Sequence, residues 1–252
     1  MKNKSSSNYI FENDIFDCQS CIPGFTDSLF KKFNSKSKDL KLELKIEDLM
    51  VGKKVNPTED QAALHPQYRR NFDSISSIKD DKSSYKNVVI LGIGGSFEGP
   101  KLLIESLHES DYDINHIFIT GSDPYEFKDK LKYLNPYDTI FIVSSKSFTT
   151  DETIESLKEA IKWSGDMKRF IAITANKEEA LKYNIEEIIE FDKEIGGRYS
   201  IWSDISLPAL FGSKSNFDFR NFLRGGHQAD EDLQKNIKYW NFVKTLSFSD
   251  IW

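Results

Sequence analysis

Short apolar segments alternate with helical segments between residues 87 and 191, and this alternation restricts the possible folds more than any other feature of the chain. The apolar segments are rich in β-branched residues, and they lie at 88–91, 116–120, 139–144, 169–174 and 186–191. Helical patterns follow the first four of them, near 98–109, 125–133, 150–163 and 177–183. Strands that are apolar throughout are typical of a parallel sheet covered on both faces. The sequence therefore predicts an α/β fold, a three-layer αβα sandwich with a five-stranded parallel sheet.

The chain divides into three parts by the character of its sequence. In residues 1–85, stretches rich in Ser, Lys and Asn separate amphipathic pieces, which predicts a partly helical N-terminal leader. Residues 86–215 hold the predicted αβα domain. Residues 216–252 are expected to start a following helical segment, and the ending Ser-Asp-Ile-Trp suggests that this segment is truncated.

Composition argues against several classes of partner. The net charge is −6 and there is no long basic run, which disfavours nucleic acid or an anionic membrane as the main partner. No apolar stretch approaches the roughly 18 residues that a membrane-spanning helix requires. The N-terminus lacks the apolar core of a signal peptide, so we expect a cytoplasmic protein.

The two cysteines, Cys18 and Cys21, form a C-x-x-C pair in the leader. A redox role would place such a pair at a helix start directly after a strand. A structural zinc site would add a second pair, or histidines at ligand spacing. Neither context is visible, so we expect coincidence or packing and predict no metal site.

A glycine-rich turn at residues 92–96 follows the first predicted strand. Right-handed crossovers bring the carboxyl ends of parallel strands to one edge, where open α/β sheets bind ligands, and glycines let the backbone approach a ligand closely. The dinucleotide fingerprint fails because Phe97 replaces its third glycine, and the P-loop fails at Pro100 and Leu102. The turn therefore predicts a small, anionic ligand that is held in neither of these ways.

The loop after the third predicted strand, residues 144–153, combines several hydroxyl residues with a lysine at a helix start. Hydroxyl groups and the free N–H groups of a helix N-terminus form a favourable phosphate site. An N-cap explains one hydroxyl residue but not a cluster with a lysine. This loop therefore predicts phosphate binding.

Three further stretches are polar. Two glycines precede Arg198, whose guanidinium can bind an oxyanion, although an ion pair with a surface carboxylate explains this arginine better when it is taken alone. Thr58 and Gln61 fit a capping box, and His65 is expected to be structural. Residues 225–231 fit another helix start.

Taken together and in this order, these motifs resemble those of the phosphoglucose isomerase (glucose-6-phosphate isomerase) family, from roughly residue 50 to the end. The glycine-rich turn is similar to the family's G-I-G-G-S-x-x-G-P loop. Residues 145–153 resemble its S-K-T-F-T-T-x-E-T loop, and residues 196–203 its G-G-R-[FY]-S-x-W-S signature. Residues 56–69 resemble the N-x-T-E-x-R-A-x-L-H-x-x-x-R segment, and 225–231 the G-[AG]-x-x-x-D-E stretch.

The resemblance implies a sugar-isomerase fold and reversible conversion of glucose 6-phosphate to fructose 6-phosphate in glycolysis and gluconeogenesis. Hexose 6-phosphate is then the partner, no cofactor is expected, and full-length family members form homodimers. The family's G-G-R arginine stabilises enediolate charge, which implies a catalytic role for Arg198. The implied substrate- and phosphate-binding residues are Gly95, Ser96, Ser145, Lys146, Ser147, Thr150, Thr153 and Gly197.

The sequence departs from the family pattern in three ways. Ser147 replaces a threonine, which keeps the hydroxyl group, and Gln61 replaces an arginine, which we expect to weaken a structural contact. The family's catalytic glutamate, ring-opening histidine and C-terminal lysine belong to motifs that follow the segment ending here at Trp252. The resemblance therefore covers the N-terminal half of the enzyme, and we expect a fragment without the catalytic base.

Two functional hypotheses remain from the sequence. The first is a phosphoglucose isomerase present as a fragment, and the alternative is a non-catalytic sugar-phosphate-binding module of the same fold. The acids near the predicted edge, Glu98, Asp151 and Glu152, open helices and are interpreted as partners of the helix dipole rather than as the base. A nucleotide-dependent oxidoreductase is excluded by Phe97.

Overall fold

A computed structural model describes most of the chain. The described residues are 8–12, 17–21, 27–55, 58, 60–71, 85–106, 114–210, 219–235, 240 and 243. Asn56 and Glu59 of the first motif and the C-terminal residues 244–252 lie outside them.

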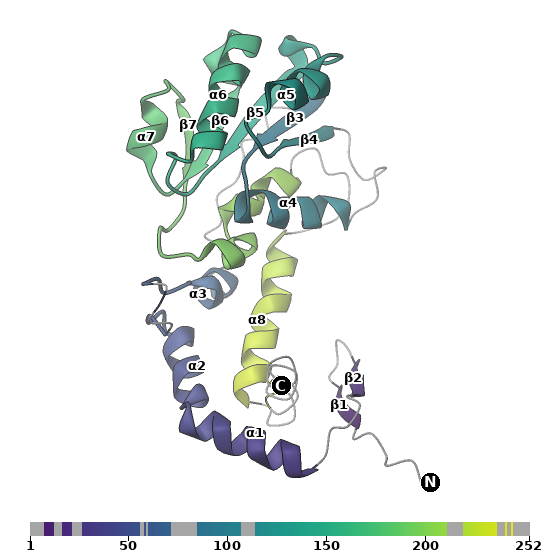
Figure 1. The fold of residues 1–252 in the computed structure, drawn as a ribbon, viewed down its shortest axis with the longest axis vertical. Coiled ribbons are helices and arrows are strands. Elements are labelled where there is room, and N and C mark those ends of the chain that lie inside the picture. Colours follow the sequence, from purple (N-terminus) through teal and green to yellow (C-terminus); the bar gives the residue numbers. More distant parts are fainter. Residues whose placement is uncertain are drawn as a thin grey trace.

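The central element is a five-stranded sheet in which every strand pair is parallel (Figure 1). Its strands are β3 (Asn87–Leu91), β4 (Asn115–Ile119), β5 (Thr139–Ser144), β6 (Phe170–Thr174) and β7 (Glu187–Glu190). Their order is β4-β3-β5-β6-β7, with β5 in the middle. This confirms the predicted sheet, and short β-branched segments that are buried on both faces are typical of a parallel sheet covered by helices.

Side chains of β5 alternate between two cores on opposite faces of the sheet. Phe141 and Val143 belong to the core under α5 (Pro124–Leu131), α6 (Asp151–Ser164) and α7 (Lys177–Leu181). Ile140 and Ile142 face the other core, which includes residues of the 3₁₀ helix η6 (Asp204–Leu210). Helix α4 (Gly95–Glu105) lies on this second side, next to η6 and η5 (Gly197–Trp202) (Figure 1).

One local expectation about a helix is corrected. Helix α4 begins at Gly95, three residues earlier than residue 98. The apolar segment after η5 forms the 3₁₀ helix η6, which contains Pro208. Proline cannot donate the backbone hydrogen bond of an α-helix interior. Ser206 also donates its hydroxyl hydrogen bond, 2.7 Å long, to the carbonyl of Ile201, which ties the segment to η5. Two short 3₁₀ turns, η3 (Pro136–Asp138) and η4 (Met167–Arg169), precede β5 and β6.

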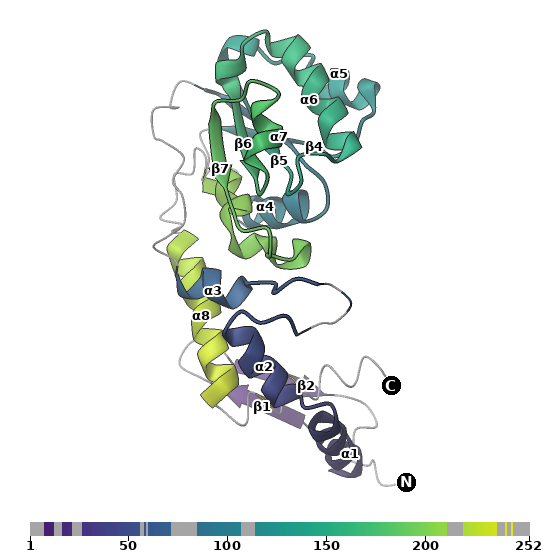
Figure 2. The same ribbon diagram turned by 90° about the vertical axis from the view of Figure 1, so that its left-hand side faces the viewer.

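The leader contains an antiparallel pair of strands as well as helices. Strands β1 (Asn8–Glu12) and β2 (Asp17–Cys21) pair with each other, and both cysteines lie on β2. Helices α1 (Asp27–Asp39), α2 (Leu42–Met50) and α3 (His65–Arg70) follow. They extend from the αβα domain alongside the C-terminal helix α8 (Phe219–Lys235) (Figure 2).

A buried ion pair joins the leader to the C-terminal helix. Arg69 of α3 donates two hydrogen bonds, 2.8 and 2.6 Å long, to the carboxylate of Asp230 in α8. Its guanidinium also lies 4.6 Å from the ring centre of Trp202. Gly226 permits this approach, because a Cβ there would be 2.3 Å from the Arg69 side chain. The family-like motifs at residues 56–69 and 225–231 therefore meet each other in space.

Two local interpretations of these motifs are wrong. Gln61 does not cap a helix, because α3 begins four residues later at His65 and its N-cap residue, Leu64, makes no side-chain cap. The stretch 225–231 lies inside α8 rather than at its start. In the second stretch Asp230 has a long-range partner, Arg69, which a local capping pattern cannot reveal.

Candidate functional site

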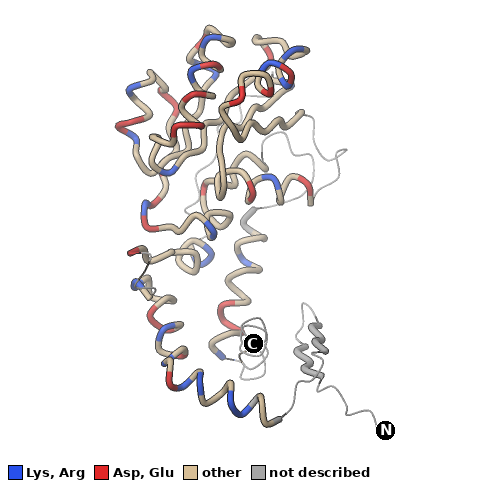
Figure 3. Tube along the Cα trace, in the orientation of Figure 1, with Lys and Arg blue, Asp and Glu red and all other residues tan. Residues whose placement is uncertain are grey.

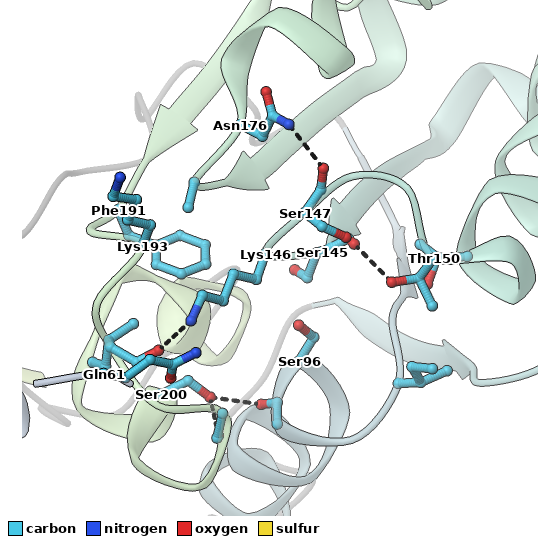
Figure 4. Close-up of a pocket in the computed structure, with 17 residues that line it drawn as sticks. Gln61, Ser96, Ser145, Lys146, Ser147, Thr150, Asn176, Phe191, Lys193 and Ser200 are labelled. Atoms are coloured by element: carbon cyan, nitrogen blue, oxygen red, sulfur yellow. Dashed lines mark hydrogen bonds between the residues drawn. The ribbon is translucent and has the colours of Figure 1, made fainter. Parts of the chain in front are cut away.

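A pocket of about 640 Å³ opens at the carboxyl edge of the sheet, where four loops meet (Figure 4). The loops follow β3, β5, β6 and β7, as the parallel topology requires. The predicted binding residues Gly95, Ser96, Ser145, Lys146, Ser147, Thr150, Thr153 and Gly197 all line this pocket. The structure thus brings together residues up to about a hundred positions apart in the sequence.

The glycine-rich turn is fixed by close contact with the loop after β7. Gly94 has φ +54° and ψ −125°, a conformation that side chains disfavour. A Cβ at Gly95 would lie 2.2 Å from the carbonyl oxygen of Gly197. The hydroxyl of Ser200 is within hydrogen-bond distance of both carbonyls, 3.1 Å from that of Gly95 and 2.8 Å from that of Gly197. The two glycines therefore bring two backbones together as well as exposing them to the pocket.

The loop after β5 presents a free helix N-terminus to the pocket. Thr150 is the N-cap of α6, and its side chain makes no capping hydrogen bond. Its hydroxyl lies 3.4 Å from that of Ser145, which also accepts a hydrogen bond from the backbone N–H of Phe148. The first-turn N–H groups of α6 remain open to a ligand, and such groups favour an anion.

Two buried hydroxyl groups in the pocket wall lack a hydrogen-bond partner among the described residues. Ser144 is 1% exposed and Thr153 is 3% exposed, and neither side-chain oxygen is hydrogen-bonded to the described part of the chain. Both residues line the pocket. A buried hydroxyl without a partner carries an uncompensated desolvation cost of about 1–3 kcal/mol. A ligand with acceptor oxygens would relieve that cost.

The loop after β5, here called the phosphate-type loop (residues 145–150), is held in an unusual backbone conformation. Phe148 has φ +55°, and its ring is only 1% exposed in the core under α6. The Asn176 amide donates to the carbonyl of Ser147 over 3.2 Å, and the Ala175 N–H donates to that of Lys146 over 3.1 Å. The buried ring and these hydrogen bonds offset the strain, which is a common arrangement at binding sites.

Positive charge in the pocket comes from lysines. The ammonium of Lys146 donates a 3.0 Å hydrogen bond to the carbonyl of Ile195. Burial lowers the pKa of Lys146, and the nearby carboxylates of Glu194 and Asp192 oppose that shift. Lys193 also lines the pocket and is exposed. Elsewhere along the described part of the chain, positive and negative residues are interspersed (Figure 3). The attraction of an anion to the pocket therefore depends on these two lysines and the nearby backbone N–H groups.

Arg198 is not among the residues that line the pocket. It is exposed, and its guanidinium lies 5.6 Å from the centre of the neighbouring Tyr199 ring. The structure thus assembles the predicted binding residues but leaves the predicted catalytic arginine beside them.

Sequence reasoning missed part of the pocket wall. Asn176, Lys193 and Ser200 line it and were not singled out. Gln61, for which the sequence suggests only helix capping and a structural contact, also lies in the pocket wall. Its place in the ordered motif series was the one available signal, since a single glutamine in a leader carries no pattern of its own.

His65 lies outside the pocket and fits a packing role. Its ring stacks on Tyr199 with centroids 4.2 Å apart. Burial, with a smaller contribution from the charge of Arg69, lowers the pKa of His65 to about 4. The imidazole is therefore neutral at pH 7. In the described part of the chain, His, Cys, Asp and Glu form no group of three or more that could hold a metal ion.

A family model described as phosphoglucose isomerase matches residues 67–252. The chain belongs to the phosphoglucose isomerase family. It is 32% identical to glucose-6-phosphate isomerase 1 of Colwellia psychrerythraea strain 34H, over 81% of this chain and 44% of that protein. It is 31% identical to glucose-6-phosphate isomerase of Wigglesworthia glossinidia brevipalpis, over 100% of this chain and 53% of that protein. This family member thus spans about half the length of the curated relatives it matches.

Solved structures agree on the fold. A glucose-6-phosphate isomerase from Chlamydia trachomatis superposes with a TM-score of 0.68 at 19% identity, covering 86% of this chain and 48% of that one. A hypothetical protein from Thermus thermophilus gives a TM-score of 0.59 at 22% identity, covering 89% of this chain and 52% of that one. No helix in the described part of the chain is long and apolar enough to cross a bilayer.

Proposed function

We propose that this chain forms the sugar-phosphate-binding half of a cytoplasmic glucose-6-phosphate isomerase, which interconverts glucose 6-phosphate and fructose 6-phosphate. The observation that carries the proposal is the pair of buried, unpartnered hydroxyl groups of Ser144 and Thr153 beside the open N-terminus of α6. Family membership supplies the substrate class, since the curated relatives carry this enzyme's name.

The phosphate is proposed to sit over the first turn of α6. There the backbone N–H groups and the hydroxyls of Ser145, Thr150 and Thr153 can donate to its oxygens. Asp151 and Glu152 also lie in that turn, but neither lines the pocket. The sugar then extends toward Ser96 and Lys146, which the close-up shows between the α6 end and the loop after β7 (Figure 4).

Isomerisation moves a proton between C2 and C1 of the open-chain sugar, so it needs a positioned general base. Among the described residues, none that lines the pocket is an aspartate, a glutamate or a histidine. We therefore expect the 252-residue chain to bind hexose phosphate and to turn it over very slowly. Arg198 would have to swing from Tyr199 toward the pocket before it could stabilise an enediolate.

The second candidate is a sugar-phosphate-binding module without catalytic activity. The same observation favours it, because a pocket wall of hydroxyls, amides and lysines can bind a phosphate ester but offers no base. The two candidates share the phosphate site and differ in whether a base from another segment completes it.

A combined binding and activity experiment tests the proposal. The chain is titrated with glucose 6-phosphate by calorimetry, beside the double variant Ser145→Ala/Thr150→Ala. The variant should lose roughly 3–6 kcal/mol of binding, at about 1.5–3 kcal/mol for each lost charge-assisted hydrogen bond. Unchanged affinity would contradict the phosphate assignment. Turnover near that of a full-length isomerase, in protein free of host enzyme, would place the base within residues 1–252.

A further inference from the structure

Gln61 is a pocket residue that the N-terminal leader supplies. It lies in the connection between α2 and α3, yet it lines the same pocket as the loops after β3, β5 and β7. No hydrogen bond from its amide to the described residues is present, whereas the amide of Gln67 in α3 donates to two carbonyls. The Gln61 amide is therefore available to a ligand.

The backbone around Gln61 is strained in a way that fixes its position. Asp60, Ala63 and Leu64 have φ values of +41°, +66° and +51°. Non-glycine residues seldom adopt these values, and each such residue costs free energy that surrounding contacts must offset. Three of them within five residues point to a constrained segment with a function.

Contacts with the loop after β7 offset this strain. Ala63 pairs with Ile195 in an isolated parallel bridge. The N–H of Ala62 donates to the Glu194 carboxylate over 3.1 Å. Lys54 adds ion pairs to Asp60 at 2.8 Å and to Glu194 at 3.9 Å. The leader is thereby joined to the loop that carries the Lys146–Ile195 hydrogen bond.

Gln61 lies at the end of the pocket that is remote from the N-terminus of α6 (Figure 4). The close-up shows it beside Ser200 and the ammonium of Lys146, with Ser147 and Thr150 across the cavity (Figure 4). A ligand with its phosphate on α6 would place its hydroxyl groups, not its phosphate, near this amide.

We propose that Gln61 is a specificity-determining residue that hydrogen-bonds the sugar hydroxyl groups of the bound hexose phosphate. The inference rests on the proposed function and extends it from the phosphate to the sugar. A carboxamide offers both donors and an acceptor, which suits hydroxyl groups that themselves donate and accept. A site built to hydrogen-bond a hydroxyl discriminates against ligands that lack it, because its buried polar groups then stay unpaired.

Gln61→Met tests this directly, since methionine keeps the length of the side chain and removes its hydrogen bonds. Affinities for glucose 6-phosphate and for inorganic phosphate are measured by NMR titration of the full 252-residue chain. We expect glucose 6-phosphate to bind about 3- to 10-fold more weakly, because the variant loses about one to two net hydrogen bonds to the sugar. The affinity for inorganic phosphate should not change. Gln228→Met, at an exposed position of α8, is the matched control and should change neither affinity.

The outcomes separate this inference from the proposed function. If Gln61→Met lowers the affinity for both ligands equally, or for neither, then Gln61 does not hydrogen-bond the sugar and the inference is overturned. If the unsubstituted chain binds inorganic phosphate but shows no preference for glucose 6-phosphate, the proposed substrate itself is wrong. Gln61→Ala, with its melting temperature compared with that of the parent, repeats the test if the methionine variant proves unstable.

Discussion

Thr153→Val should raise the stability of the free protein while it weakens phosphate binding, and this pair of opposite signs is a sharp test of the site. Thr153 is the third residue of α6, its side chain is 3% exposed, and its hydroxyl lacks a hydrogen-bond partner. Valine has nearly the same shape and the same branching at Cβ, so packing and helix propensity change little.

The two effects follow from the same hydroxyl group. A buried donor without a partner costs about 1–3 kcal/mol, so its removal should raise the free energy of unfolding by about 1 kcal/mol. In the complex the hydroxyl donates to a charged phosphate oxygen, a bond worth roughly 1.5–3 kcal/mol. The variant should therefore bind phosphate and glucose 6-phosphate about 10- to 100-fold more weakly.

Thr139→Val is the matched control, measured by the same urea unfolding and ligand titrations. Thr139 is also fully buried, but it lies at the start of β5, and its hydroxyl donates a 2.8 Å hydrogen bond to the carbonyl of Asn135. Its replacement should lower the free energy of unfolding by about 1 kcal/mol and leave binding unchanged. If Thr153→Val instead destabilises the protein as much as this control and binds phosphate normally, the reasoning about the site is refuted.

Three further predictions concern stability. Gly95→Ala should lower the free energy of unfolding, measured with urea, by about 1–3 kcal/mol, because its Cβ would lie 2.2 Å from a carbonyl oxygen. Gly197→Ala is the control and should change the free energy of unfolding little, because no atom lies within 4 Å of its Cβ. Equal effects of the two variants would contradict the packing argument. His65 has a pKa of about 4 in the folded chain against 6.5 for an ordinary histidine, so the unfolded chain binds the extra proton between these values and stability should fall as pH drops from 6.5 to 4. The full pKa shift corresponds to about 3 kcal/mol of stability, reduced to about 1–2 kcal/mol by partial exposure. His65→Phe should remove this part of the pH dependence of urea unfolding. An unchanged pH profile would show that His65 is not its source. Asp230→Asn should cost about 3–5 kcal/mol in the same assay, because it leaves the buried guanidinium of Arg69 without its charge partner, and a loss below about 1 kcal/mol would show that the pair is solvated.

The sheet and the position of the site were predictable from the sequence because their signals are local. Each strand is a short apolar run, such as residues 139–144, and its burial on both faces follows from composition alone. The topology of parallel strands then places every following loop at one edge, so the loops holding Ser96, Ser145 and Gly197 had to converge. Which hydroxyls lie near α6 also followed from the sequence, since they precede or open that helix.

Tertiary contacts decided what no local pattern could. Arg69 finds Asp230 161 residues away, and the Gln61 segment is held by Glu194 and Ile195 of another loop. The left-handed backbone of Phe148 contradicts its local preference and persists because the ring is buried. Local propensity is worth tenths of a kcal/mol per residue, whereas the loss of one partner of a buried ion pair, or of a buried ring, costs several kcal/mol, so long-range packing overrides propensity. The sequence therefore determined the sheet and the edge at which the pocket lies, and only the folded chain decided which leader residue enters the pocket.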